Sequence, residues 1–363
     1  NRSTLEWTWV SGASSYDQAG VYGVKGVGSS GNVPGARAGA TGWMDSSGQL
    51  WLFGGVDGTY NNLFNDLWKF NTSTLAWTWV SGSSQPNQTG VYGTKGISSV
   101  NNSPGARSGA ASWIDSSGNL WLFGGGSSNS GVYLNDLWRF SPGSGEWTWI
   151  SGSNSTNQAG DYGVKGIASA TNTPGARIDV AKWTDSSGNF WAFGGQGIDS
   201  AGGIDYLNDL WKFNSTTLQW TWVSGDKLGH QPGVYGVKGT ASISNVPGNR
   251  SGAVSWLDSA GNLWLFGGFG SAGYLNDLWK FNPSTSEWTW MSGSNTGLNS
   301  GGGTYGTPGV GATTNKPPVR YSGNSWVDVN GDRWLFGGIA TSTLYNDLWK
   351  YDPVTNEWTW MKG

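Results

Sequence analysis

Short apolar runs separated by glycine-rich polar turns recur along the whole chain. The clearest run, Leu-Trp-Leu-Phe at residues 120–123, is followed by two glycines. Related runs occupy residues 50–53, 190–193, 263–266 and 333–336. A run of this length between turn signals predicts a buried strand, and paired glycines let the backbone turn or approach another chain closely. Each run therefore marks the same strand of a repeated unit.

A second motif, Asn-Asp-Leu-Trp, sets the repeat length. Its aspartates are 70, 73, 68 and 70 residues apart, at Asp66, Asp136, Asp209, Asp277 and Asp347. In the second repeat the pattern predicts strands at residues 106–115, 120–123, 134–140 and 146–150, joined by the glycine-containing turns of short antiparallel connections. The same reading places five four-stranded units at residues 35–80, 105–150, 175–223, 248–291 and 318–361.

A segment of about 25 residues precedes each unit and contains Tyr-Gly-x-Lys-Gly. Four copies begin at Tyr22, Tyr92, Tyr162 and Tyr235, whereas the fifth copy, at Tyr305, reads Tyr-Gly-Thr-Pro-Gly. Recurrence in every repeat predicts an ordered segment in which the lysine holds its own loop in place.

The chain resembles the kelch-repeat β-propeller family over nearly its whole length. The resemblance rests on Phe-Gly-Gly, Asn-Asp-Leu-Trp-(Lys/Arg)-(Phe/Tyr) and Glu-Trp-Thr-Trp in register. It implies an all-β, kelch-like β-propeller, a single domain over residues 1–363, with five four-stranded antiparallel blades. Its period near 70 exceeds the kelch period of about 50, the excess being the Tyr-Gly-x-Lys-Gly segment.

The last strand of the unit is present in six copies, one more than the other strands. The surplus copy, at residues 5–10, and the copy at residues 357–361 compete for the same place on the fifth blade. The surplus strand marks a fragment of a longer array, an extra edge strand, or a strand that docks on a second molecule. The residues of this predicted assembly edge are Leu5, Trp7, Trp9, Trp358 and Trp360.

Composition narrows the partners. Charged residues make up 12% of the chain, and its net charge is −3. This balance argues against nucleic acid as a partner, and no apolar run approaches the length of a membrane span. The expected partners are a protein, a second copy of the chain, or a glycan. The Ser-, Thr- and Asn-rich surface favours an extracellular or cell-surface protein, bacterial in type.

Catalytic chemistry has few residues to use. The chain has one histidine and no cysteine, which excludes Cys/His dyads and multi-histidine metal sites. The copper site of galactose oxidases, whose propeller is similar, needs several histidines and a Cys–Tyr crosslink and is excluded as well. We expect no cofactor and no metal. A site built from two carboxylates stays open.

Most of the tryptophans and charges recur at equivalent positions, which indicates packing and fixed ion pairs between the strand-opening arginines and the Asn-Asp-Leu-Trp aspartates. Departures from the repeat are more informative. Asp179 stands where we read glycine in other repeats (Gly39, Gly109, Gly252 and Gly323), on a strand expected to line the central channel. The third repeat also has an eleven-residue loop at residues 196–206. The candidate ligand-binding residues are Asp179, Lys182, Asp199, Asp205 and His230.

The sequence thus predicts a non-enzymatic binding, adhesion or structural propeller, with self-assembly through strand addition as a further expectation. The alternative is a carbohydrate-binding protein or a carboxylate-based glycan hydrolase with a site near the third blade.

Overall fold

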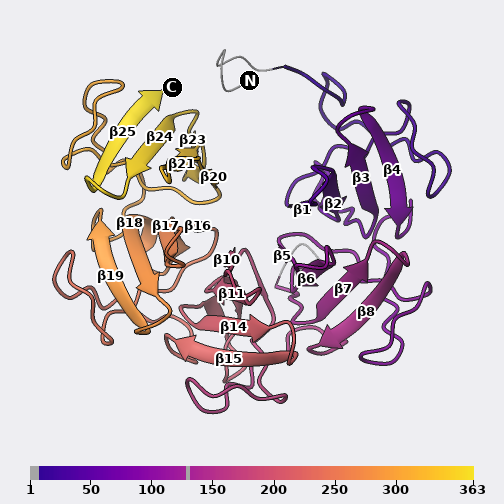
Figure 1. Ribbon diagram of the computed structural model, residues 1–363, viewed down its shortest axis with the longest axis horizontal. Helices are drawn as coiled ribbons and strands as arrows, with labels where there is room; N and C mark the ends of the chain where they lie inside the picture. Colours follow the sequence, from indigo (N-terminus) through magenta and orange to yellow (C-terminus); the bar gives the residue numbers. More distant parts are fainter. Residues whose placement is uncertain (1–7, 128–130) are drawn as a thin grey trace. The chain divides into compact units, whose positions relative to one another are not determined.

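The computed structural model describes residues 8–127 and 131–363, and the secondary structure of these residues consists of β-strands and turns without a helix. Five four-stranded antiparallel sheets follow one another along the chain (Figure 1). The first comprises β1 (Thr41–Met44), β2 (Leu50–Phe53), β3 (Leu67–Asn71) and β4 (Ala76–Ser81), and the second β5 (Ala111–Ile114), β6 (Leu120–Phe123), β7 (Leu137–Ser141) and β8 (Glu146–Ser151). The third comprises β10 (Ala181–Thr184), β11 (Phe190–Phe193), β14 (Leu210–Asn214) and β15 (Gln219–Ser224), and the fourth β16 (Val254–Leu257), β17 (Leu263–Gly270), β18 (Gly273–Asn282) and β19 (Glu287–Ser292). The fifth comprises β20 (Asn324–Val327), β21 (Arg333–Phe336), β24 (Leu348–Asp352) and β25 (Glu357–Lys362). These sheets are the blades of a kelch-like β-propeller, which confirms the predicted fold class.

The described residues group into two compact units. Those up to Val132, together with Asp136–Asn154, form unit 1, which holds the first two sheets. Unit 2 comprises Tyr133–Asn135 and Ser155–Gly363 and holds the other three sheets.

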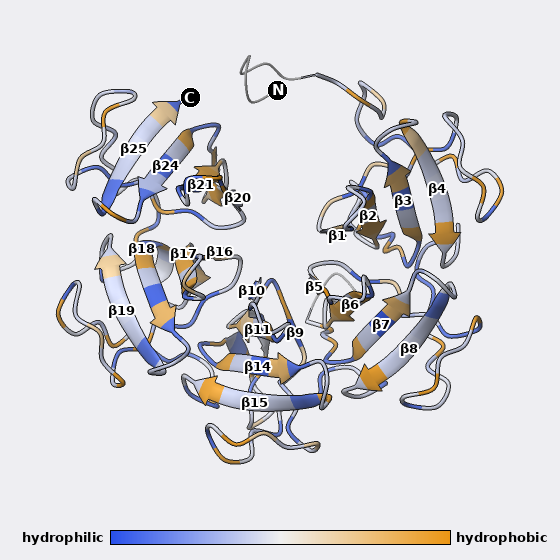
Figure 2. Cartoon of the chain, viewed as in Figure 1, coloured by the Kyte–Doolittle hydropathy of each residue, from blue (hydrophilic) through white to orange (hydrophobic). Residues whose placement is uncertain are grey.

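Within each unit, consecutive sheets pack against each other through their buried side chains. In unit 1, one buried cluster joins the first sheet to the second through Phe53 and Trp147, whose ring centroids are 5.6 Å apart. In unit 2, Phe193 and Trp288 repeat this contact at 5.5 Å. Figure 2 shows hydrophobic residues interspersed along the strands of every sheet. The recurrent tryptophans therefore pack mainly between strands and sheets, as their periodicity predicts.

The double glycine is the point where one sheet approaches the next. Gly54 has a φ of 66°, and a Cβ there would lie 2.5 Å from the carbonyl oxygen of Arg107. The next residue, Gly55, donates its N–H to that same carbonyl at 2.8 Å. Glycine is required because only hydrogen fits in this contact.

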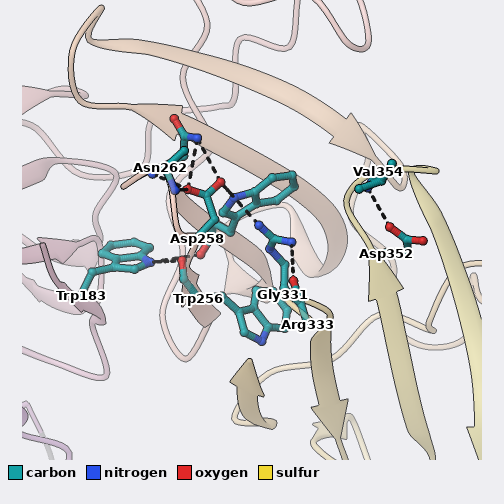
Figure 3. Close-up of polar contacts among 10 residues, drawn as sticks. Trp183, Trp256, Asp258, Asn262, Gly331, Arg333, Asp352 and Val354 are labelled. Carbon is teal, nitrogen blue, oxygen red and sulfur yellow. Dashed lines mark hydrogen bonds and ion pairs between the residues drawn. The ribbon is translucent and has the colours of Figure 1, made fainter. Parts of the chain in front are cut away.

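Side-chain hydrogen bonds reinforce the packing between sheets in unit 2. Trp183 donates its indole N–H to the backbone oxygen of Trp256 at 2.9 Å. Arg333, which replaces an apolar residue of the other repeats, contacts the Asp258 carboxylate at 3.5 Å (Figure 3). The same carboxylate accepts backbone N–H groups of its own hairpin turn, so it contacts residues of both the fourth and the fifth sheet.

The first strand of each sheet is shorter than predicted. In the second sheet it begins at Ala111 rather than at residue 106, because Gly109 takes the left-handed conformation, with a φ of 65°. Gly109 donates its N–H to the backbone oxygen of Gly39, which lies just before β1 in the first repeat, at 2.9 Å. The residues before the strand thus bond to the neighbouring sheet, and ladder pairing starts later.

The connections between the second and third strands carry pairing that the sequence did not predict. In the third repeat, β12 (Gln196–Ile198) and β13 (Ile204–Tyr206) form a hairpin that pairs with β9 (Arg177–Ile178). In the fourth sheet, β17 and β18 themselves extend into the connection, and in the fifth it holds β22 (Ile339–Ala340) and β23 (Thr343–Leu344). We call these connections the variable hairpins.

Candidate functional site

A buried polar network is repeated in all five sheets. In the third sheet, Arg177 forms a bidentate ion pair with Asp209 at 2.6 and 2.8 Å, and the same carboxylate accepts hydrogen bonds from Tyr162 and Trp211. Equivalent ion pairs join Arg37 to Asp66, Arg107 to Asp136, Arg250 to Asp277 and Arg320 to Asp347. Burial and the adjacent carboxylate raise the pKa of Tyr162. The network is fully satisfied and present in every repeat, which fits a structural role.

The segment before each sheet, which we call its entry segment, covers the free edge of that sheet's last strand. In the third sheet, Gly166 and Ser169 donate their N–H groups to the carbonyls of Trp222 and Trp220 on β15. The Asn172 amide adds a hydrogen bond to the Trp220 carbonyl at 3.0 Å. Such cover protects an edge strand from pairing with another chain.

The same cover lies over the predicted assembly edge at Trp358 and Trp360. Their carbonyls on β25 accept hydrogen bonds from Ala312 and Gly309 of the fifth entry segment. β25 is the fourth strand of the fifth sheet, paired with β24. Strand addition at this edge would first require displacement of the entry segment.

The surplus strand falls partly on residues that the structure does not describe. Leu5 and Trp7 lie outside the described residues. Within the described part, Thr8–Val10 has no strand assignment, and Trp9 is 64% exposed.

Asp179 lies just before β10 with a φ of 54°, the left-handed conformation also found at Gly39, Gly109 and Gly252. The fifth equivalent residue is Ser322, with a φ of 56°, and not Gly323, which corrects our alignment of this position. The Asp179 carbonyl accepts the N–H of Gly252 at 2.8 Å, and Ser322 donates to Gly252 in turn. Burial raises the pKa of the Asp179 carboxyl to about 6.

Lys182 follows on β10, where its backbone pairs with Ala192 of β11. Its carbonyl accepts the hydroxyl of Ser255 from the next sheet at 3.0 Å. Burial lowers the pKa of the Lys182 ammonium to about 8. A half-buried aspartate just before the first strand and a half-buried lysine on that strand are specific to the third repeat.

Asp199 has a structural role in the third variable hairpin. One carboxylate oxygen accepts the N–H groups of Ala201 and Gly203, both at 2.9 Å. The other accepts the N–H of Gly229 at 3.1 Å. These bonds fix the hairpin against the loop that carries His230, and the Asp199 residue is only 8% exposed.

His230 takes the place of an asparagine that binds a variable hairpin in earlier repeats. There Asn87 and Asn157 accept the N–H groups of Leu63 and Tyr133 through their side chains. In the third repeat the corresponding N–H, that of Tyr206, is bound by Asp205 at 2.7 Å. The His230 imidazole therefore does not bind the hairpin N–H. It is 73% exposed and lies 3.5 Å from the Asp205 carboxylate.

Four aromatic rings gather beside this pair, all of them partly exposed, and we call them the aromatic patch. They come from the variable hairpins and from the start of the fifth sheet: Tyr206, Phe269, Tyr274 and Tyr321. Phe269 is central, with its ring centroid 5.4 Å from that of Tyr206, 4.6 Å from that of Tyr274 and 6.4 Å from that of Tyr321. Burial raises the pKa of the Tyr206 hydroxyl, and the nearby Tyr133 adds to this effect.

The structure thus brings Asp205 and His230 together beside aromatic residues that the sequence analysis missed. The available signal was Tyr-Leu-Asn-Asp, which gives a tyrosine in the second to fourth repeats where the first and fifth have leucine (Tyr133, Tyr206, Tyr274, Leu63 and Leu344). Asp179 is not part of the patch but acts on Tyr133, whose pKa is raised by burial and by this carboxylate. Across residues 8–127 and 131–363 no group of three acidic or histidine side chains is placed to hold a metal ion. None of the described segments forms a helix long and apolar enough to cross a membrane.

Comparisons with known proteins agree with this architecture. The model of the KLHDC2/KLHL20/DRC7 Kelch-repeats domain matches residues 24–158 and 240–362, which is more than half of the chain. The chain therefore belongs to the kelch-repeat family.

Three curated relatives are similar at low identity. The chain is 26% identical to a leucine-zipper-like transcriptional regulator 1 homolog from Drosophila melanogaster, over 58% of this chain and 24% of that protein. It is 27% identical to Kelch repeat-containing protein 2 from Saccharomyces cerevisiae, over 50% of this chain and 18% of that protein. It is also 27% identical to Kelch domain-containing protein 10 from Bos taurus, over 48% of this chain and 33% of that protein. The matches thus span a third or less of each relative.

Family membership implies a protein-interaction propeller rather than an enzyme. This supports the sequence-based prediction of a non-enzymatic binding module.

Proposed function

We propose that the aromatic patch of unit 2 is the surface on which a protein partner docks. The observation that carries this proposal is that three consecutive repeats contribute partly exposed aromatic rings to one cluster. Tyrosine and phenylalanine are frequent anchors of protein interfaces, since they bury large areas with few rotatable bonds. Asp205 and His230 at the margin supply polar groups that can fix the orientation of the partner.

The residues of the aromatic patch lie in parts of the repeat that vary between sheets and that the fold does not need to be constant. The Arg–Asp network is the same in every sheet, whereas the variable hairpins differ in length, pairing and aromatic content. Loops held on a rigid scaffold commonly carry binding residues. The variable hairpins of the third and fourth sheets therefore carry the specificity.

The test is a comparison of two double variants. The patch variant is Tyr206→Ser with Tyr274→Ser, and the control is Val329→Ser with Val354→Ser, which changes two residues that are 92% and 91% exposed in other turns. Proteins captured from the native host by the wild type are purified and their affinity is measured. We expect the patch variant to lose roughly 30-fold or more in affinity and the control to bind as the wild type. Equal affinity of the two variants would refute the proposal.

A glycan ligand is the second candidate, favoured by tyrosine faces next to the Asp205 carboxylate. A glycan array probed with the wild type and the patch variant separates the two. Glycan binding that the patch variant loses, without any protein partner that depends on the patch, would support the glycan reading.

We also propose that the protein works outside the cell or at its surface, from its charge-poor composition of 12% charged residues. Labelling of intact host cells with a membrane-impermeant reagent should modify it. Labelling only after lysis would contradict this location. Self-assembly stays a proposal for the segment at residues 5–10, and a monomer at high concentration in native mass measurement would contradict it.

A further inference from the structure

Four lysines occupy the same small site on the last strand of their sheets. Each lysine of Tyr-Gly-x-Lys-Gly places its ammonium group over an indole ring and donates a hydrogen bond to a glycine carbonyl at the end of that strand. The ammonium-to-ring distances are 4.3, 4.3, 4.2 and 4.2 Å for Lys25 on Trp79, Lys95 on Trp149, Lys165 on Trp222 and Lys238 on Trp290. The hydrogen bonds to the carbonyls of Gly82, Gly152, Gly225 and Gly293 measure 2.7, 2.8, 2.7 and 3.2 Å.

The fifth repeat keeps the framework of this site and lacks the lysine. Pro308 stands at the lysine position. The following residue, Gly309, still donates its N–H to the backbone carbonyl of Trp360 at 2.8 Å. Tyr305 still bonds to Asp347, and its ring packs edge-on against Trp360 with centroids 5.1 Å apart. The corresponding rings in the fourth repeat, Tyr235 and Trp290, are 5.0 Å apart, so the aromatic side chains that line the two sites are arranged alike.

A pocket of about 330 Å³ lies at this place in the fifth repeat. Its lining includes Tyr305, Leu344, Asn346, Trp360 and Gly363. Gly363 has the left-handed φ of its counterpart Gly293, at 108° against 85°, and follows the same strand. In the part of the chain that the structure describes, no lysine or arginine lies over the Trp360 ring.

The indole nitrogen of Trp360 gives an independent observation. In the other four sheets this N–H donates to the carbonyl of the serine two residues later, as Trp290 does to Ser292 at 2.8 Å. The residue two positions after Trp360 is Lys362, and its backbone carbonyl does not accept this N–H. The Trp360 nitrogen is buried and has no acceptor among the described residues. A ligand that offers an acceptor beside a cation would complete this site.

The chemistry of the site selects a primary ammonium on a short alkyl chain. An indole face and a carbonyl oxygen attract a cation, whereas the nearby Asp347 is already neutralised by its ion pair with Arg320 at 2.6 Å. Leu344, which is 78% exposed at the rim, offers apolar surface for methylene groups. A lysine residue of a peptide supplies all three features, since its backbone carbonyl can accept the Trp360 N–H.

We propose that the pocket formed by Tyr305, Trp360 and Gly363 is a lysine-recognition site that binds a lysine side chain of a protein partner. The four internal lysines show the mode of binding, and the fifth sheet takes its lysine from another molecule. The pocket is separate from the aromatic patch, and the proposal does not depend on the function assigned there.

The test uses the whole chain labelled with 5-fluorotryptophan, with the Trp360 resonance assigned through Trp360→Phe. The probe is N-acetyl-lysine methylamide, and its control is the uncharged N-acetyl-norleucine methylamide. We expect the lysine probe to shift the Trp360 resonance saturably and the norleucine probe to leave it in place.

Two variants make the result specific. Pro308→Lys restores the residue of the other repeats, and we expect it to abolish the response of Trp360 by filling the site from within. Lys165→Thr opens the equivalent site of the third repeat, and we expect Trp222 to begin to respond. An unresponsive Trp360 in the wild type, an equal response to norleucine, or an undiminished response in Pro308→Lys would each overturn the proposal.

Discussion

Asp277 and Tyr274 lie three residues apart on β18 and have opposite relations to the repeat. Asp277 is fully buried, pairs with Arg250 at 2.6 Å and has an equivalent in every sheet. Tyr274 is partly exposed, and its ring lies 4.6 Å from Phe269 in a cluster that only unit 2 contains among the described residues. The difference separates residues common to all repeats, which hold the sheets, from residues that depart from the repeat and form the proposed binding surface.

The largest effect is expected where the repeated network is broken. Arg177→Met leaves Asp209 buried without its cation, which should lower the free energy of unfolding by about 3–5 kcal/mol. Urea unfolding measures the change. The control is Lys227→Met, which removes an exposed cation of the same repeat and should change stability little. Equal stability of the two variants would show that the network does not hold the sheet.

A smaller loss is expected when the cover of the sheet edge is weakened. Asn172 donates to the carbonyls of Ile167 and Trp220, so Asn172→Ala leaves two acceptors without this donor. The expected loss is about 1–3 kcal/mol, together with faster hydrogen exchange in the entry segment of the third sheet. The exposed neighbour Thr171→Ala serves as the control, and protection unchanged in Asn172→Ala would contradict the edge-covering role.

Asp179 tests the comparison between repeated and departing residues in another way, because it departs from the repeat at a position outside the proposed binding surface. Burial raises the pKa of its carboxyl to about 6. The folded chain therefore binds more protons than the unfolded chain between about pH 4 and pH 6, and the stability of the wild type should fall as pH rises through this window.

Asp179→Gly should remove this loss. At pH 7 we expect the free energy of unfolding to rise by about 1–2 kcal/mol, since burial of a carboxylate and left-handed strain both disappear, and to rise less at pH 4. Ser322→Gly is the matched control, because its φ of 56° is relieved without any titrating group. A gain in Asp179→Gly that does not change with pH would contradict the burial of the charged form.

The smallest effect concerns the lysines of the entry segments. Lys165→Met keeps the alkyl chain but removes the ammonium that lies 4.2 Å from the Trp222 ring and donates to Gly225. Because the site is at the surface, the expected loss is only about 0.5–1 kcal/mol. Calorimetric unfolding measures it, with Lys227→Met again as the control. A loss as large as that of Arg177→Met would place the lysines in the structural network.

Much of the fold could be predicted from the sequence because the same pattern of residues recurs in five repeats. The apolar runs, the turns and the Arg–Asp pairs recur in register, so each strand and each ion pair could be inferred from its copies. The entry segments were predicted to be ordered, but their position on the far edge of the same sheet depends on pairing across some 50 residues, which local pattern does not show.

The aromatic patch could not be predicted in the same way. Phe269 and Tyr321 interrupt the pattern at unrelated positions of consecutive repeats, and only the packing of the fourth sheet against the fifth brings their rings together. His230 was recognisable as the single histidine, but its release by Asp205 required the hydrogen bonds of the hairpin. Sequence periodicity thus reveals what all repeats share and leaves open how their exceptions meet.

The most direct test compares Asp277→Ala with Tyr274→Ala by urea unfolding and by affinity for the captured partner. We predict that Asp277→Ala lowers the free energy of unfolding by about 3–5 kcal/mol, because it leaves Arg250 buried without its anion. We predict that Tyr274→Ala costs about 1 kcal/mol of stability and most of the binding. A Tyr274→Ala variant that binds as the wild type, or an Asp277→Ala variant as stable as the wild type, would contradict the division between repeated and departing residues.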